Sequence, residues 1–391
     1  MGRMLAVGGE ALEESDDAEV DYLDSYHDDL EQWYLSIMVE PEFINFPKRR
    51  LHVTMDAYMP AIFGSKFRFR SKEDMLRLLN VWRLPERIYL EDGTVVSSEF
   101  VMLFSIRRLA THTNLDDFAQ FEFGREYSTL SRIFKFFVLF TFNTFAQKLS
   151  NNLPFFVDKF PDYAEAIRLK MNERGGANIA AGNFAISSFI DCKITSVART
   201  GGGPAGHGGP NAERNDPHLQ QAMYNRWARR HGIKNQSVEF PCGLSGDMWG
   251  PGSCRHNDLW LLFESDINNK MAAAQEGSPL QYFMYGDAIY PRRSHLRSRH
   301  GPQGGVLFDP ELRAQDRGMT ACREAVEWSF QEADLLFPFM TYKEKMKARG
   351  MPLREIYFTK CLLRNCYNCL YHSKASKFFG CPPPTLEEYM D

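Results

Sequence analysis

Apolar residues recur at helical spacing through the first half of the chain. Met75, Leu78, Leu79 and Trp82 mark a helical pattern in the region from about 65 to 92, and the pattern ends at Pro85. A turn at Asp92-Gly93 follows this pattern. The first third of the chain is therefore predicted to be helical.

Three further helices are predicted in succession after this turn. Ser97 or Ser98 can cap the first, the second lies around residues 115–121, and Ser128 opens the third after Gly124. Three helices with a glycine before the last are typical of a helix-turn-helix, here residues 97–147. Arg125 and Arg132 would then contact DNA. A plain helical bundle fits the same pattern.

Strand patterns appear after about residue 176. Apolar runs predict strands at 184–192 and 280–285 and a hairpin that pairs 237–240 with 247–249. Helical patterns cover about 220–231, 257–265, 319–336 and 353–370. The fold class predicted for this half is α/β, and a glycine-rich loop lies at 200–210.

Charge is distributed unevenly along the 391 residues. The chain carries a net charge of −4, but residues 1–31 hold eleven acidic residues and one basic residue, a local charge of −10. The remainder is therefore +6, since −4 + 10 = +6. An acidic, disordered arm is predicted for residues 1–35, attached to a mildly basic body.

Cysteine usage and hydropathy suggest a soluble intracellular protein. The eight cysteines are scattered, which favours a reducing compartment over a disulfide framework. The most apolar run, 134–145, is too short to span a bilayer, so no membrane association is expected. No signal peptide is expected either.

Three acidic residues stand in apolar surroundings. Asp191 and Asp287 end predicted strands, and Glu327 lies within a predicted helix. Buried carboxylates need a compensating cation, and two Mg²⁺ or Mn²⁺ ions held by carboxylates are a common means of cleaving phosphodiesters. Glu324 shares a helix face with Glu327, and Asp258 is a further candidate. The alternative is that these residues are caps, turn residues or surface ion pairs.

A family resemblance bears on this choice. Short motifs follow one another between about residues 65 and 390: Phe67-Arg68-Phe69-Arg70, Asp92-Gly93-Thr94-Val95, Arg107-Arg108-Leu109-Ala110, Phe123-Gly124-Arg125, Leu130-Ser131-Arg132-Ile133-Phe134, Phe189-Ile190-Asp191, Gly250-Pro251, Arg255-His256, Tyr285-Gly286-Asp287, Val326-Glu327-Trp328 and Pro383-Pro384-Thr385-Leu386-Glu387-Glu388-Tyr389. In this order they resemble the motifs of the DDE superfamily endonucleases related to PIF/Harbinger transposases.

The resemblance implies a fold, a site and a cellular setting. It implies an RNase H-like mixed five-stranded sheet flanked by helices at 176–372, preceded by the helical region 36–175 and followed by a tail at 373–391. It implies that Asp191, Asp287 and Glu327 are the catalytic, metal-binding triad, with Glu327 preferred to Glu324. It also implies a nuclear location and a Myb-like DNA-binding partner protein. An oligomer is compatible with the resemblance.

Two clusters of arginines are candidate DNA contacts. Arg226, Arg229 and Arg230 are interleaved with aromatic residues, and Arg292 and Arg293 follow Asp287 closely. Solvated surface faces are the alternative. Lys193, two residues after Asp191, is expected either to contact phosphate or to compete with a metal ion.

Two functions follow from these patterns. The first is a metal-dependent DNA endonuclease or transposase-like enzyme that cleaves phosphodiester bonds by a two-metal mechanism. The alternative is a domesticated, catalytically silent DNA-binding or scaffold protein that retains the transposase fold. Metal-dependent cleavage of DNA distinguishes the two.

Overall fold

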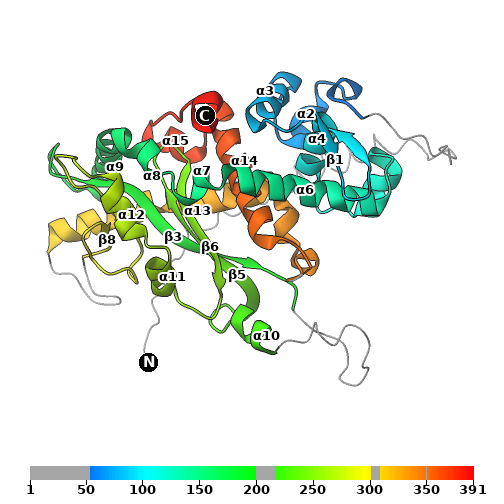
Figure 1. Ribbon diagram of the computed structural model, residues 1–391. Helices are drawn as coiled ribbons and strands as arrows, with labels where there is room; N and C mark the ends of the chain where they lie inside the picture. Colours follow the sequence, from blue (N-terminus) through cyan, green and yellow to red (C-terminus); the bar gives the residue numbers. More distant parts are fainter. Residues whose placement is uncertain (1–52, 200–216, 301–308, 349) are drawn as a thin grey trace, which may run out of the picture. The chain divides into compact units, whose positions relative to one another are not determined.

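The computed structural model describes residues 53–199, 217–300, 309–348 and 350–391 (Figure 1). The acidic arm predicted at 1–35 and the glycine-rich loop at 200–210 lie outside these ranges. By its internal contacts, Leu51–Asp391 forms one compact unit. No helix in the described ranges has both the length and the apolar character needed to cross a bilayer.

The first helical pattern is divided into two helices. It forms α2 (Ile62–Phe67) and α3 (Lys72–Trp82), which end well before residue 92. The break occurs because Arg68 adopts a left-handed conformation with φ of 71°, and Ser71 then caps α3 by accepting a hydrogen bond from the Asp74 N–H. The short antiparallel strands β1 (Arg87–Tyr89) and β2 (Val95–Ser97) follow on either side of the Asp92-Gly93 turn.

Three helical segments lie where the sequence predicts them after this turn. They are α4 (Ser98–Leu109), α5 (Leu115–Asp117) continued by the π-helical turn η2 (Phe118–Glu122), and α6 (Tyr127–Phe145). The Ser97 hydroxyl caps α4 by accepting from the Phe100 N–H. α4 packs on α6 through buried aromatic and aliphatic side chains. Their use as a helix-turn-helix remains a prediction.

A mixed sheet forms the centre of the second half. Its main strands are β3 (Ile186–Ser196), β5 (Arg230–Glu239), β6 (Ser245–Ser253), β7 (Phe283–Tyr285) and β8 (Leu296–Arg297). β3, β5 and β6 pair antiparallel in that order, whereas β7 pairs parallel to β3 and β8 parallel to β7. A sixth, two-residue strand, β4 (Tyr224–Asn225), pairs with the start of β5.

The helix predicted at about 220–231 is wrong for most of its length. α10 (Pro217–Met223) ends early, and the chain then forms β4, a turn and the start of β5. The first part of β5 was not predicted as a strand. Its buried residues Lys234, Asn235 and Gln236 are polar, so the alternation of apolar and polar residues that indicates a strand is absent there.

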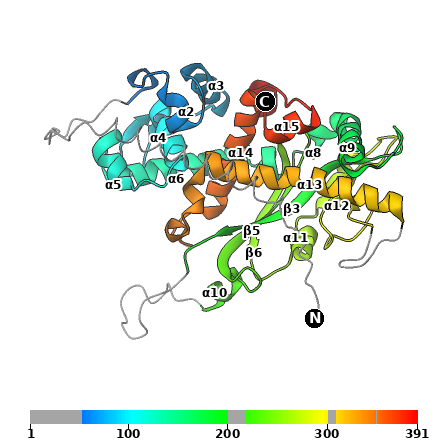
Figure 2. The same cartoon turned by 180° about the vertical axis from the view of Figure 1, so that it is seen from behind.

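Two long helices flank the sheet. α9 (Phe160–Gly175) and α13 (Pro310–Leu336) both contact β3, and α13 crosses the sheet on the side nearer the viewer in Figure 2. Their backbones meet where Gly175 faces Gly318, since a Cβ atom on Gly318 would lie 2.2 Å from the Met171 carbonyl oxygen. The remaining helices are η1 (Met55–Ala57), α7 (Gln147–Ser150), α8 (Leu153–Phe156), η3 (Val157–Lys159), α11 (Asp258–Glu264), α12 (Ile267–Ala274), η5 (Pro338–Thr341), η6 (Lys343–Lys345), α14 (Leu353–Tyr371), α15 (Lys374–Phe379) and α16 (Leu386–Met390).

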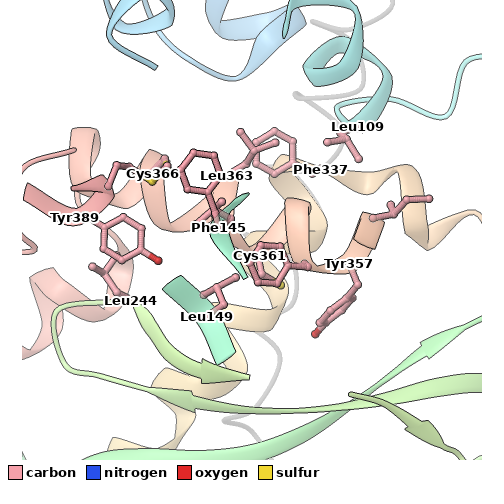
Figure 3. Packing of buried hydrophobic residues seen from close by; sticks show 14 of the residues in the cluster. Leu109, Phe145, Leu149, Leu244, Phe337, Tyr357, Cys361, Leu363, Cys366 and Tyr389 are labelled. Atoms are coloured by element: carbon pink, nitrogen blue, oxygen red, sulfur yellow. The ribbon is translucent and has the colours of Figure 1, made fainter. Parts of the chain in front are cut away.

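The segment predicted as a tail, 373–391, is folded. Its helices α15 and α16 bury Phe379, Leu386 and Tyr389. Figure 3 shows Tyr389 beside Leu244, with Cys366 of α14 in the same layer of buried side chains. The C-terminal residues therefore belong to the main core.

A buried polar network joins α14 to the sheet. Arg364 is 2% exposed, and its guanidinium pairs with Glu239 of β5 and Glu332 of α13, each at 3.1 Å. It also donates to the Ser245 hydroxyl and the Gly243 carbonyl. The Glu239 carboxylate is itself only 3% exposed, so its charge depends on this partner.

Replacing Arg364 by Met is expected to destabilise the protein by about 3–5 kcal/mol, because the substitution leaves a buried carboxylate without its cation. Urea unfolding followed by circular dichroism measures the change in stability. Arg83→Met is the control, since Arg83 forms an exposed ion pair with Asp391, and it should change stability by less than about 1 kcal/mol. Equal effects of the two substitutions would contradict the role given to the network.

Candidate functional site

Two of the predicted acids lie on neighbouring parallel strands. Phe189 of β3 is paired with Tyr285 of β7, and each candidate aspartate lies two residues farther along its own chain segment. Asp191 is inside β3, not at its end as predicted, because β3 continues to Ser196 alongside β5. Asp287 follows β7 directly. Neighbouring strands are separated by about 4.8 Å, so this register brings the two residues close together.

The third predicted acid, Glu327, is connected to Asp191 by an arginine side chain. Arg323 of α13 donates from one guanidinium nitrogen to Asp191 Oδ2 at 3.0 Å and from another to Glu327 Oε1 at 2.9 Å. Both glutamates are exposed on α13, but Glu324 makes no ion pair in the described part of the chain. Of the two candidate glutamates, Glu327 is therefore the one linked to Asp191.

Asp191 and Asp287 both have raised pKa values, chiefly because their carboxylates are buried. Burial raises the pKa of Asp191 to about 6; the Cys192 N–H and Arg323 oppose this shift, and the charges of Asp287 and Asp258 add to it. Burial also raises the pKa of Asp287, with a further contribution from Asp258, against the opposing effect of the Ile289 N–H and Arg323. The three aspartates thus form one electrostatically coupled cluster.

Asp258 belongs to this cluster but has its own cation. It begins α11, and its carboxylate accepts from Lys234 Nζ of β5 at 2.7 Å. Lys234 is buried and also donates to the His256 carbonyl. The cluster therefore holds four carboxylates, counting Glu327, and two cationic side chains.

Lys193 does not point into this cluster. Its ammonium group binds Asp334 and donates to the Phe330 carbonyl, both on α13. Lys360 of α14 binds the other oxygen of Asp334. Lys193 therefore fastens α13 to β3.

A groove runs from the acidic cluster along β3 and α13. It has a volume of about 710 Å³, and Asp191 and Glu327 lie in its wall together with Arg230 from the start of β5. Phe330 and Leu335 of α13 provide apolar wall. The groove thus joins the candidate acids to one of the predicted arginine clusters.

The predicted DNA-contacting arginines are dispersed over three regions. Arg125 lies over the Phe100 ring at 5.1 Å, and Arg132 pairs with Asp92. Arg292 and Arg293 are exposed between β7 and β8. Arg226, Arg229 and Arg230 are exposed around the turn between β4 and β5. No single surface containing all seven arginines is formed by the described residues.

The donor atoms suit a hard divalent cation at Asp191 and Asp287. Carboxylate oxygens are the ligands that Mg²⁺ and Mn²⁺ prefer, and a cation would offset the burial and the smaller repulsion that raise both pKa values. In the described residues, however, no three His, Cys, Asp or Glu side chains are already arranged as a metal site. Glu327 would join such a site through its other oxygen or by release of Oε1 from Arg323.

Sequence reasoning did not anticipate the bridging role of Arg323. Its spacing of four residues from Glu327 predicts their helical ion pair, but its contact with Asp191, 132 residues away, depends on the packing of α13 against β3. The contact of Lys234 with Asp258 was not predicted either, because the sequence does not show that this lysine is buried within a strand.

Comparisons of the chain with protein-family models, curated proteins and solved structures give no match.

Replacing Asp191 by Asn is expected to change how stability depends on pH. The pKa of Asp191 is higher in the folded state, so the folded state binds more protons and wild-type stability falls as pH rises from 3.8 to about 6. The variant lacks this decrease and should gain up to about 3 kcal/mol relative to wild type between pH 4 and 7. Urea unfolding across this range provides the measurement, and a difference that does not vary with pH would contradict the assignment.

Proposed function

We propose that this protein is a divalent-metal-dependent DNA nuclease or transposase-like enzyme of the DDE type. The proposal is carried by one observation: Asp191 and Asp287 extend from neighbouring parallel strands, and α13 brings Glu327 to the same cluster through Arg323. The mixed sheet, with β3, β5 and β6 antiparallel and β7 and β8 parallel to β3, supports the RNase H-like core that the family resemblance implies.

The chain's own residues would hold the reacting groups in place. The Cys192 N–H fixes one oxygen of Asp191 at 2.7 Å, and the Ile289 N–H fixes one oxygen of Asp287 at 3.0 Å. Divalent cations in such sites stabilise charge on the attacking and leaving oxygens of a phosphodiester. Asp191, Asp287 and Glu327 would bind them, and the groove beside β3 would accept the DNA backbone.

Regions outside the cluster would contribute to DNA binding. The exposed Arg292 and Arg293 lie in the segment that follows Asp287, so phosphate contacts there would fall beside the site of cleavage. The α4, α5 and α6 region would dock DNA as a helix-turn-helix, with Arg125 near the start of α6. Nuclear location and a Myb-like partner belong to the same proposal and rest on the family resemblance.

One observation favours the silent alternative, a DNA-binding or scaffold protein. Arg323 already pairs with both Asp191 and Glu327, so the described structure compensates part of their charge without a metal ion. A protein that had lost catalysis could keep its fold through this ion pair. Metal-dependent cleavage decides between the two functions.

Asp191→Asn, Asp287→Asn and Glu327→Gln are each expected to lower cleavage of supercoiled DNA in Mg²⁺ or Mn²⁺ by at least about 100-fold, because each removes a ligand oxygen from the transition state. Gel electrophoresis of nicked and linear products gives the rate. Glu324→Gln, one helical turn away, is the matched control and should cleave at the wild-type rate. Absence of metal-dependent cleavage by the wild type, with DNA binding retained, would favour the silent alternative.

Neutralising Arg292 and Arg293 together, as Arg292→Gln with Arg293→Gln, should weaken binding to DNA of any sequence. Each phosphate that the protein no longer neutralises reduces the slope of log affinity against log salt by about 0.9, so the slope should fall by up to about 2. Fluorescence anisotropy at several salt concentrations measures it. Lys159→Gln with Arg174→Gln removes two exposed cations elsewhere and serves as the control. An unchanged slope in the Arg292 and Arg293 variant would remove these residues from the DNA interface.

A further inference from the structure

The turn between β4 and β5 presents a tryptophan to solvent. Tyr224 pairs with His231 and Asn225 with Arg230, which leaves a four-residue turn, 226–229. Trp227 stands in this turn and is 93% exposed. An indole ring offers one of the largest apolar surfaces of any side chain, and such rings are usually buried at least in part. Its exposure here indicates a surface that meets a ligand.

The turn holds Trp227 in a defined position. The Asn225 side chain accepts from the Ala228 N–H at 2.6 Å across the turn and donates to the Cys254 carbonyl at 3.0 Å. Arg229 closes the turn with a left-handed φ of 50°. Because the turn is fixed from within, little conformational entropy is lost when a ligand stacks on the ring.

Positive charge surrounds the ring. Arg226, Arg229 and Arg230 lie in or beside the turn, and Arg199 and Arg255 are exposed near its base. No carboxylate in the described ranges forms an ion pair with any of these five arginines; Arg230 donates to the Ser196 hydroxyl at 3.3 Å. Burial and then the charge of Arg199 lower the pKa of His231, which is consistent with a cationic neighbourhood. An anionic ligand with flat rings suits this surface.

The turn adjoins the groove that contains Asp191 and Glu327, two of the three candidate acids. Arg230 lies in the groove wall together with Asp191 and Glu327. Along β5, Arg230 precedes Ser237, the partner of Asp191, by seven residues, or roughly 24 Å at 3.4 Å per residue. A polymer that follows this groove from the acids would reach the arginines and the tryptophan at its far end.

We propose that the 226–229 turn binds an unpaired DNA base, with Trp227 as the stacking platform and the surrounding arginines as phosphate contacts. Base faces inside a duplex already stack on each other, so an exposed indole face selects single-stranded or flipped nucleotides. The preferred substrate is then DNA with an unpaired stretch to one side of the cleaved bond. Only this placement beside the cut rests on the proposed function; base stacking by Trp227 does not.

The test compares the binding of one DNA sequence as a single strand and as a duplex. Fluorescence anisotropy is measured with the full chain in EDTA on a labelled 20-nucleotide strand, so that cleavage cannot contribute. Trp227→Ala should weaken single-strand binding by about 5- to 100-fold, which corresponds to the removal of one stacked base. Duplex binding should change by less than about twofold. Trp227→Phe should restore most of the single-strand affinity, because its ring can still stack.

Tyr89→Ala is the matched control. Tyr89 is an exposed aromatic residue in β1, outside both the proposed surface and the helix-turn-helix region, and its removal should leave single-strand affinity unchanged. Equal weakening of single-strand and duplex binding in Trp227→Ala, or no weakening of either, would overturn the proposal. So would binding to neither form by the wild type. If the chain binds single strands through Trp227 but cleaves no DNA, the proposed nuclease function is rejected and the stacking site is retained.

Discussion

The contact of Arg323 with both Asp191 and Glu327 is the interaction on which the site depends. Asp191, Asp287 and Asp258 repel one another across the end of the β3–β7 pairing, and burial makes that repulsion costly. Arg323 offsets part of this cost and at the same time ties α13 to the sheet. The same guanidinium supplies one positive charge between the Asp191 and Glu327 carboxylates, while the Asp287 carboxylate forms no ion pair in the described residues.

Polar contacts along α13 hold it in the position that this arrangement requires. Ion pairs form at three positions along the helix. Arg323 binds Asp191, and Glu332 binds Arg364. Asp334 binds both Lys193 and Lys360. Although burial alone would raise the pKa of Asp334, the two lysines hold it below its usual value. The close approach of α9 to α13 at Gly175 fixes the other side of the helix. The site is therefore built by packing and not by a local motif.

The sequence predicted those parts of the fold that depend on local pattern. The spacing of apolar residues predicted the helices α4, α6, α13 and α14. Apolar runs predicted the strand that contains Asp191 and the strand that precedes Asp287. Patterns could not show that Arg230–Glu239 is one strand, because Lys234 and Gln236 are buried polar residues whose side-chain partners, Asp258 and Ser265, are distant in the sequence. Nor could they show the Arg323 contact with Asp191, or that Trp227 stays exposed in a turn within a segment predicted to be helical.

The central claim is the proposal that Asp191 and Asp287, each two residues beyond the Phe189–Tyr285 pair of β3 and β7, form a cation site whose Asp191 side Arg323 covers at rest. Crystals of the protein soaked in Mn²⁺ and recorded at the manganese absorption edge test it most directly, because anomalous scattering locates the ion itself. The account predicts a peak within about 2.5 Å of carboxylate oxygens of both Asp191 and Asp287, with Arg323 displaced from Glu327. Manganese bound only elsewhere, with the Arg323 contacts intact, would contradict it.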